Sequence, residues 1–87
     1  MARQVHPEVE AMVSNLNSDE VVDLVFVCDN GWGKDVADSI AQFGGEVKSV
    51  LPSDVLVAEV TVSDIPKATS ISHVKSVSPD REARALA

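Results

Sequence analysis

The chain has 87 residues, a formal net charge of −7 and a hydrophobic content of 45%. This length fits one domain with a single modest core, and its wealth of aliphatic residues argues against disorder. The acidity predicts repulsion from phosphate backbones, so no nucleic-acid partner is expected. The simplest interpretation of the negative charge is that it keeps the protein soluble. The more specific interpretation is that it attracts a basic or neutral partner.

The N-terminus, the hydropathy and the cysteine content bear on location. Residues 1–10 contain no apolar run typical of a signal peptide. No segment approaches the roughly 20 apolar residues of a membrane-spanning helix, so no membrane partner is expected. We expect a cytoplasmic protein if the chain is complete, and a secreted one if it is excised from a precursor. Cys28 is the only cysteine and is expected to be a buried, inert thiol.

Residues 7–17 are predicted to form a helix. Pro7 suits its first turn, and apolar residues recur at i, i+3, i+4 and i+7 from Val9 to Leu16. This helix precedes the rest of the pattern, so residues 1–20 are interpreted as an N-terminal extension. Its apolar stripe must be buried on a sheet face, at a sheet edge or by self-association.

The next segment predicts strand, helix and strand. VVDLVFVCD (21–29) is apolar on both sides, which is typical of a central strand. KDVADSIAQF (34–43) has apolar residues at helical spacing, and Gly44-Gly45 ends that helix. EVKSVL (46–51) is the second strand.

The same order then repeats. A turn leads to a third strand, VLVAEVTV (55–62), so the second and third strands form a hairpin. SDIPKATSIS (63–72) predicts a weaker helix, with Ser63 as its cap and Pro66 in its first turn. HVKSV (73–77) is the last strand.

This order predicts an α+β fold, a ferredoxin-like βαββαβ sandwich. We expect an antiparallel four-stranded sheet with two helices on one face, plus the extra N-terminal helix. The expected organisation is an extension over 1–20, the ferredoxin-fold domain over 21–79 and an extended C-terminal tail over 80–87.

No residue pattern indicates catalysis or metal binding. His6 and His73 form no local signature with a nucleophile, so they are interpreted as surface histidines and no enzyme is expected. The acidic run Asp19, Glu20 and Asp23 lacks the spacing of a calcium loop. We therefore expect no catalytic residue, no metal and no cofactor.

The segment GWGKD (31–35) contains glycines and a lysine, as a phosphate-binding loop does. That motif needs glycine at Cys28 and Ser or Thr at Asp35, so the comparison fails. Trp32 is interpreted as a lid over the edge of the core, with an exposed contact residue as the alternative. Phe26 is the only aromatic residue on a central strand, which argues against RNA binding.

Four segments occur in a characteristic order: DLVFVC, KDVADSIAQFGGEVKSVL, VLVAEVTVSDIPKA and HVKSVSPDREARAL. The last combines a Val-x-x-Val strand with a Pro-Asp corner and a tail. From Val22 onward the chain resembles the propeptide and inhibitor family of subtilisin-like serine proteases. The resemblance implies a ferredoxin-like protein without enzymatic activity, which inhibits such a protease or acts as an intramolecular chaperone for it.

The resemblance also implies how the two proteins meet. In the family the open sheet face packs on two surface helices of the protease, and the tail runs through the active-site cleft like a product. Asp80 matches the acid that caps a protease helix, a favourable place for a carboxylate. Ser78 and Pro79 complete this docking corner. Ser78 stands where the family often has a second acid, a departure that weakens docking.

The tail residues have an implied register. Ala83 matches the small residue four places before the scissile bond, and Leu86 matches the large residue in the primary pocket. Arg84 and Ala85 lie between them, and Ala87 lies past the bond. A shift by one residue would place Ala87 in the primary pocket, a poorer fit. The alternative is that these residues are a frayed terminus.

A different class of function is the alternative to a protease inhibitor. A ferredoxin-like module without a protease partner could bind other proteins, or form a homodimer, through a sheet edge or the N-terminal helix. A stable oligomer that does not affect proteases is the expected sign of this alternative.

Overall fold

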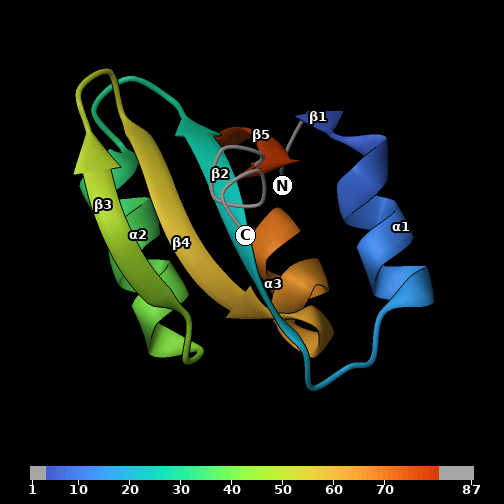
Figure 1. Cartoon of the computed structure of the whole chain (residues 1–87). Coiled ribbons are helices and arrows are strands. Elements are labelled where there is room, and N and C mark those ends of the chain that lie inside the picture. Colours follow the sequence, from blue (N-terminus) through green and yellow to red (C-terminus); the bar gives the residue numbers. More distant parts are fainter. Residues whose placement is uncertain (1–3, 81–87) are drawn as a thin grey trace.

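A computed structural model describes residues 4–80, in which a five-stranded mixed sheet carries three α-helices and one short 3₁₀ helix (Figure 1). The elements in chain order are β1 (Gln4–Val5), α1 (Pro7–Asn15), β2 (Val21–Cys28), α2 (Gly33–Gln42), β3 (Glu46–Leu51), β4 (Val55–Thr61), η1 (Val62–Asp64), α3 (Ile65–Thr69) and β5 (Val74–Pro79).

The strands lie in the order β1-β5-β2-β4-β3. β2 is antiparallel to both β4 and β5, and β3 is antiparallel to β4. The predicted α+β class is therefore confirmed, and the order of the four longer strands is compatible with a ferredoxin-like fold. The prediction of a purely antiparallel four-stranded sheet is wrong in one respect, because β1 adds a fifth strand that runs parallel to β5.

The fifth strand has a local cause. Gln4 and Val5 pair with Ser76 and Val77, and the His6 N–H donates to the Val77 carbonyl over 2.9 Å. These bonds use backbone groups that would otherwise be exposed at the outer edge of β5. Two residues are too short to give a strand pattern in the sequence, so β1 was not predicted.

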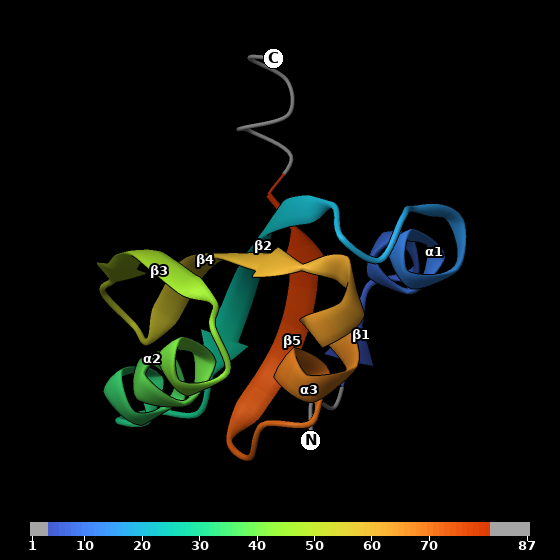
Figure 2. The same cartoon turned by 90° about the horizontal axis from the view of Figure 1, so that it is seen from below.

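The core lies between the sheet and the helices on one of its faces. Figure 2 shows α2 and α3 on the same side of the sheet, with α1 beside β1 and β5. Alternate residues of β2 and β4 point toward those helices, as the two-residue period of a strand requires. The buried core consists of Val9, Met12, Leu24, Phe26, Cys28, Val36, Ile40, Leu56, Ala58, Val60, Val62, Ile65, Ala68, Val74 and Val77.

The N-terminal helix packs at the edge of the sheet. Pro7 lies in its first turn, and His6 caps it because Nδ1 accepts the Glu8 N–H over 3.0 Å. α1 contacts β5 and η1, and its residues Val9 and Met12 are buried, whereas Val13 remains 42% exposed. Of the three locations considered for the apolar stripe, the edge is the one observed.

The helix predicted over residues 63–72 is shorter in the structure than its sequence pattern suggested. It divides into η1 and α3, and the latter ends at Thr69. The Thr69 and Ser70 hydroxyls both donate to the Pro66 carbonyl, over 3.1 and 2.8 Å, which competes with continuation of the helix. Ser63 is not the cap, since Asp64 occupies that position without a side-chain hydrogen bond. The Ser63 N–H instead donates to Ser18 O over 3.0 Å.

The last strand begins and ends later than predicted. His73 has a φ of 69°, so it belongs to the preceding turn. β5 extends to Pro79, and the Asp80 N–H continues the ladder by donating to Asp23 O over 3.1 Å. Because N–H groups of alternate residues point to opposite sides of a strand, the missing N–H of Pro79 is on the side away from β2. Throughout residues 4–80, no helix has the length and hydropathy that crossing a bilayer requires.

Candidate functional site

The sheet face opposite α2 and α3 is covered by no helix or strand of the described residues. Residues directly opposite each other on paired strands share a face, so the register defines this surface. Val25 lies opposite Val57 and Ser78, and Val57 lies opposite Ser49. We call this surface the open face. It comprises Val25, Val27, Ser49, Leu51, Val55, Val57, Ser76 and Ser78.

The open face has apolar side chains at its centre and small polar side chains on the strands at either side. Four valines of β2 and β4 form two cross-strand pairs, Val25 with Val57 and Val27 with Val55. Serines flank them on β5 and β3, and Leu51 is 45% exposed at one corner. The solvated face of an antiparallel sheet is normally polar. A flat, aliphatic surface of this kind is suited to contact with another protein.

One end of the open face carries a compensated charge cluster. Asp23 lies opposite Glu59 on the same side of the sheet. Lys48 Nζ lies 3.6 Å from Asp23 Oδ1 and 3.3 Å from Glu59 Oε2. The hydrogen bond to Glu59 and the charge of Asp23 raise the pKa of Lys48. Asp23 Oδ1 is buried and accepts no hydrogen bond in the described structure, so Lys48 is what compensates its charge.

The predicted docking corner lies at this same end. Ser78 is half-buried on the open face, and Pro79 is buried opposite Leu24 on the helix-covered side. Asp80 stands beside Asp23, where the chain leaves the sheet. The other predicted tail residues lie outside the described residues: Ala83, Arg84, Ala85, Leu86 and Ala87.

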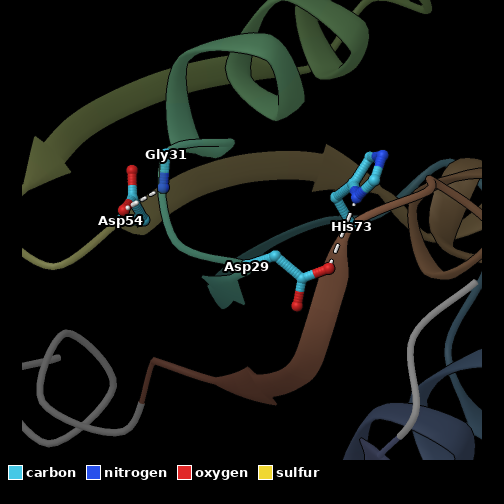
Figure 3. A network of polar contacts seen from close by, with 4 residues as sticks. All are labelled: Asp29, Gly31, Asp54 and His73. Atoms are coloured by element: carbon cyan, nitrogen blue, oxygen red, sulfur yellow. Dashed lines mark hydrogen bonds and ion pairs between the residues drawn. The ribbon is translucent and has the colours of Figure 1, made fainter.

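A second cluster of polar groups lies at the opposite end of β5. Asp54, in the turn between β3 and β4, accepts the Gly31 N–H over 2.8 Å (Figure 3). It also accepts the Gly33 N–H over 3.1 Å. A phosphate bound at the start of α2 would need these same two N–H groups as hydrogen-bond donors. Since a carboxylate of the chain already holds them, the failure of the phosphate-loop comparison has a structural reason.

Trp32 and His73 form the other part of this cluster. Their rings stack with centroids 3.6 Å apart. His73 Nδ1 also lies 3.4 Å from Asp29 Oδ2, as Figure 3 shows. The prediction of Trp32 as a lid over the core is wrong, because Trp32 is 41% exposed and stacks on the exposed His73. The two residues are 41 positions apart in the sequence. No local motif could therefore have joined them.

The described residues lack a complete catalytic or metal-binding arrangement. An Asp–His pair needs a hydroxyl or thiol hydrogen-bonded to the histidine for nucleophilic catalysis. Ser39 and Ser72 line the same surface hollow as His73, but neither hydrogen bonds to it. Cys28 is buried, and that burial, together with the charges of Asp54 and Asp29, raises its pKa to about 11. Within residues 4–80, no group of three His, Cys, Asp or Glu side chains is placed to hold a metal ion.

Comparison of the chain with protein-family models and with the sequences of curated proteins gives no match.

Proposed function

We propose that this chain binds a subtilisin-like serine protease and inhibits it or assists its folding. The open face would dock on the protease, and residues 80–87 would lie in its active-site cleft. The observation that carries the proposal is the position of α1 at the sheet edge, which leaves the open face accessible. The sequence resemblance from Val22 onward supplies the class of partner.

The fold supports this proposal in its topology. Without β1, the sheet has the order β5-β2-β4-β3, and α2 and α3 cover one side. We take this unit to be the ferredoxin-like module that the resemblance implies. β1 and α1 add to it at the outer edge of β5, so they do not obstruct the open face.

The open face also has the chemistry of a docking surface. Its valines are held flat by the strands and lose little conformational freedom when they are covered. Lys48 neutralises part of the acidic end, which lowers the cost of removing Asp23 and Glu59 from water. The remaining acidic character favours a partner surface that is basic or presents helix N-termini.

The position of Asp80 supports the proposed role of the tail. The chain leaves β5 at the end of the open face, beside Asp23. A partner that covers this face therefore has the start of the tail at its boundary. An extended segment gains affinity by adding backbone hydrogen bonds in a strand-like cleft. Attachment to a folded domain lowers the entropy cost of binding that segment.

The test is an inhibition assay. The pure protein is mixed with several subtilisin-like proteases, and hydrolysis of a chromogenic peptide is measured. We expect inhibition at micromolar concentrations or below. Deletion of residues 82–87 and the substitution Leu86→Lys should each abolish it. Deletion of Ala87 alone is the matched control and should leave inhibition nearly unchanged. The far-ultraviolet circular dichroism of each variant checks that the domain stays folded.

Two outcomes would contradict the proposal in different ways. Absence of inhibition by the full chain removes the protease partner, unless the chain accelerates refolding of a denatured protease, which would instead identify a folding-assisting propeptide. Full potency after deletion of residues 82–87 removes the tail mechanism while keeping the docking face. A standalone inhibitor fits a cytoplasmic location, and an excised propeptide fits a secreted one.

A homodimer is the second candidate, and one observation favours it. β3 is one of the two edge strands of the sheet, and the exposed residues Val50 and Leu51 lie on it. Edge strands pair with other chains unless charges or bulges prevent it, and the irregular register of β3 lies between Val47 and Ser49, before these two residues. Light scattering separates the two candidates, since a concentration-independent dimer without protease inhibition would favour this one.

A further inference from the structure

We propose that the helix-covered side of the molecule carries a second protein-binding site, which takes an arginine side chain of a partner. The site is a surface hollow of about 400 Å³ between α2 and the turn before β5. We call it the Trp32 hollow. It is lined by Trp32, Asp35, Val36, Ser39, Ile71, Ser72 and His73.

The walls of the Trp32 hollow are held in place from two sides. Trp32 is the N-cap of α2, and Val36 and Ser39 follow it at the spacing of successive turns on one face of the helix. Opposite them, the Asp29 N–H donates to the His73 carbonyl over 2.7 Å and fixes the turn that carries the histidine. The stacked rings of Trp32 and His73 connect these two walls. The hollow is therefore preformed, as binding sites for side chains usually are.

The chemistry of the hollow favours a flat cation. One face of the Trp32 indole is stacked on His73, and Trp32 is still 41% exposed, so we place the guanidinium against the part of the ring that His73 leaves uncovered. Asp35 supplies an exposed carboxylate at the rim, within the first turn of α2. Ile71 lines the hollow with aliphatic surface that suits the arginine stem, and the almost fully buried Val36 adds little to it. The net charge of −7 adds long-range attraction for a basic partner.

Arginine fits this arrangement better than lysine. A guanidinium stacks on an aromatic ring and binds a carboxylate with two parallel hydrogen bonds. It is also more weakly hydrated than an ammonium group, so it leaves water at lower cost. The Trp32 hollow lies on the side of the sheet that carries α2 and α3. A partner bound there would leave the open face accessible, so this inference does not rest on the proposed protease contact.

The test uses a capped peptide as the probe. The isotopically labelled full chain is titrated with acetyl-Ala-Ala-Arg-Ala-Ala-amide, and amide chemical shifts are followed by NMR. Emission of Trp32 gives an independent signal, since the chain has one tryptophan and no tyrosine. We expect saturable shifts centred on residues 32–39 and 71–73, with a dissociation constant on the order of millimolar. The same peptide with Gln in place of Arg should give none.

Two variants of α2 distinguish the site from general charge attraction. Asp35→Asn should weaken binding by roughly three- to tenfold, as expected for the loss of a partly screened ion pair. Asp38→Asn removes the same charge from an exposed position of the same helix that does not line the hollow, and should change binding less than twofold. Equal weakening by both variants would overturn the proposal.

Three further results would also count against the Trp32 hollow. The first is the absence of saturable shifts at peptide concentrations on the order of 10 mM. The second is a set of shifts that maps to the open face. The third is equal affinity for the matched lysine peptide, which would reject the guanidinium. Inhibition of proteases is measured separately, so failure here leaves the proposed function unaffected, and the reverse also holds.

Discussion

The two faces of the sheet differ although the same strands build both. Phe26 points toward α2 and α3 and is fully buried, while its neighbour Val25 points the other way and is half-buried. Both faces are aliphatic, yet the described helices pack against only one. Burial of the covered face accounts for the fold through the hydrophobic effect. The valines of the open face add less to stability, which is the reason to look for a partner there.

The largest expected effect is on the covered face. Phe26→Ala should lower the free energy of unfolding by about 3–5 kcal/mol, because it removes buried area and leaves a cavity. Val25→Ala, one position away on the open face, should cost about 1 kcal/mol or less. Urea denaturation followed by circular dichroism measures both. Similar losses would mean that the open face is covered in solution.

A second prediction concerns the titration of Cys28, which is buried on the covered face. Burial, assisted by the charges of Asp54 and Asp29, raises the pKa of Cys28 from 9.0 to about 11. Its contribution to stability is therefore complete below pH 9, and it is lost as pH rises toward 11, since the unfolded chain releases the thiol proton first. Between pH 8 and pH 10.5 the expected loss from this group is about 2 kcal/mol. Denaturation at pH 8 and pH 10.5 tests this, and Cys28→Ala should reduce the difference.

A third prediction concerns the contact between the β3–β4 turn and α2. Asp54→Gly should destabilise the protein by about 1–2 kcal/mol, because the Gly31 and Gly33 N–H groups lose their acceptor. Asp54 has a φ of 60°, which glycine adopts without strain, so the loss reports the carboxylate. Asp54→Asn keeps one acceptor and should cost less. A larger loss for Asn than for Gly would contradict this assignment.

Substitutions on the open face should have the smallest effect on stability but a large effect on binding to the protease. Val25→Thr combined with Val57→Thr preserves side-chain shape on the open face and should cost less than about 1 kcal/mol of stability. The added hydroxyls would be desolvated in a complex, so inhibition of the protease should weaken about tenfold or more. Val13→Thr on α1 is the control with equal chemistry outside the open face. Unchanged inhibition by the double variant would remove the open face from the binding mechanism.

Much of the fold was predictable because its signals are local. The valine-rich segment around Phe26 gave the central strand, and Pro7 and Pro66 were correctly placed in first turns. The end of α3 was not, since the Ser70 hydroxyl bonds back to Pro66 in a way that residue propensities do not specify. β1 could not be predicted, because two residues are too few to show the alternation of apolar and polar side chains that marks a strand.

The functional surfaces were predictable only in part. Strand alternation and the resemblance together implied an open sheet face, but the place of α1 depended on tertiary packing. The stacking of Trp32 on His73 and the bond from Asp54 to Gly31 join residues that are distant in sequence. Such contacts follow from the topology of the whole sheet, so no pattern within a short window could show them.

The position of β2 has a consequence for how the chain acquires its structure. β2 is the first long strand to be synthesised, and one of its two neighbours, β5, is the last. The hairpin of β3 and β4 is local and is able to form early, whereas the contact of Leu24 with Pro79 closes a long loop. We therefore expect the sheet to be completed only when β5 arrives, so folding is coupled to the emergence of the segment that leads directly into the tail.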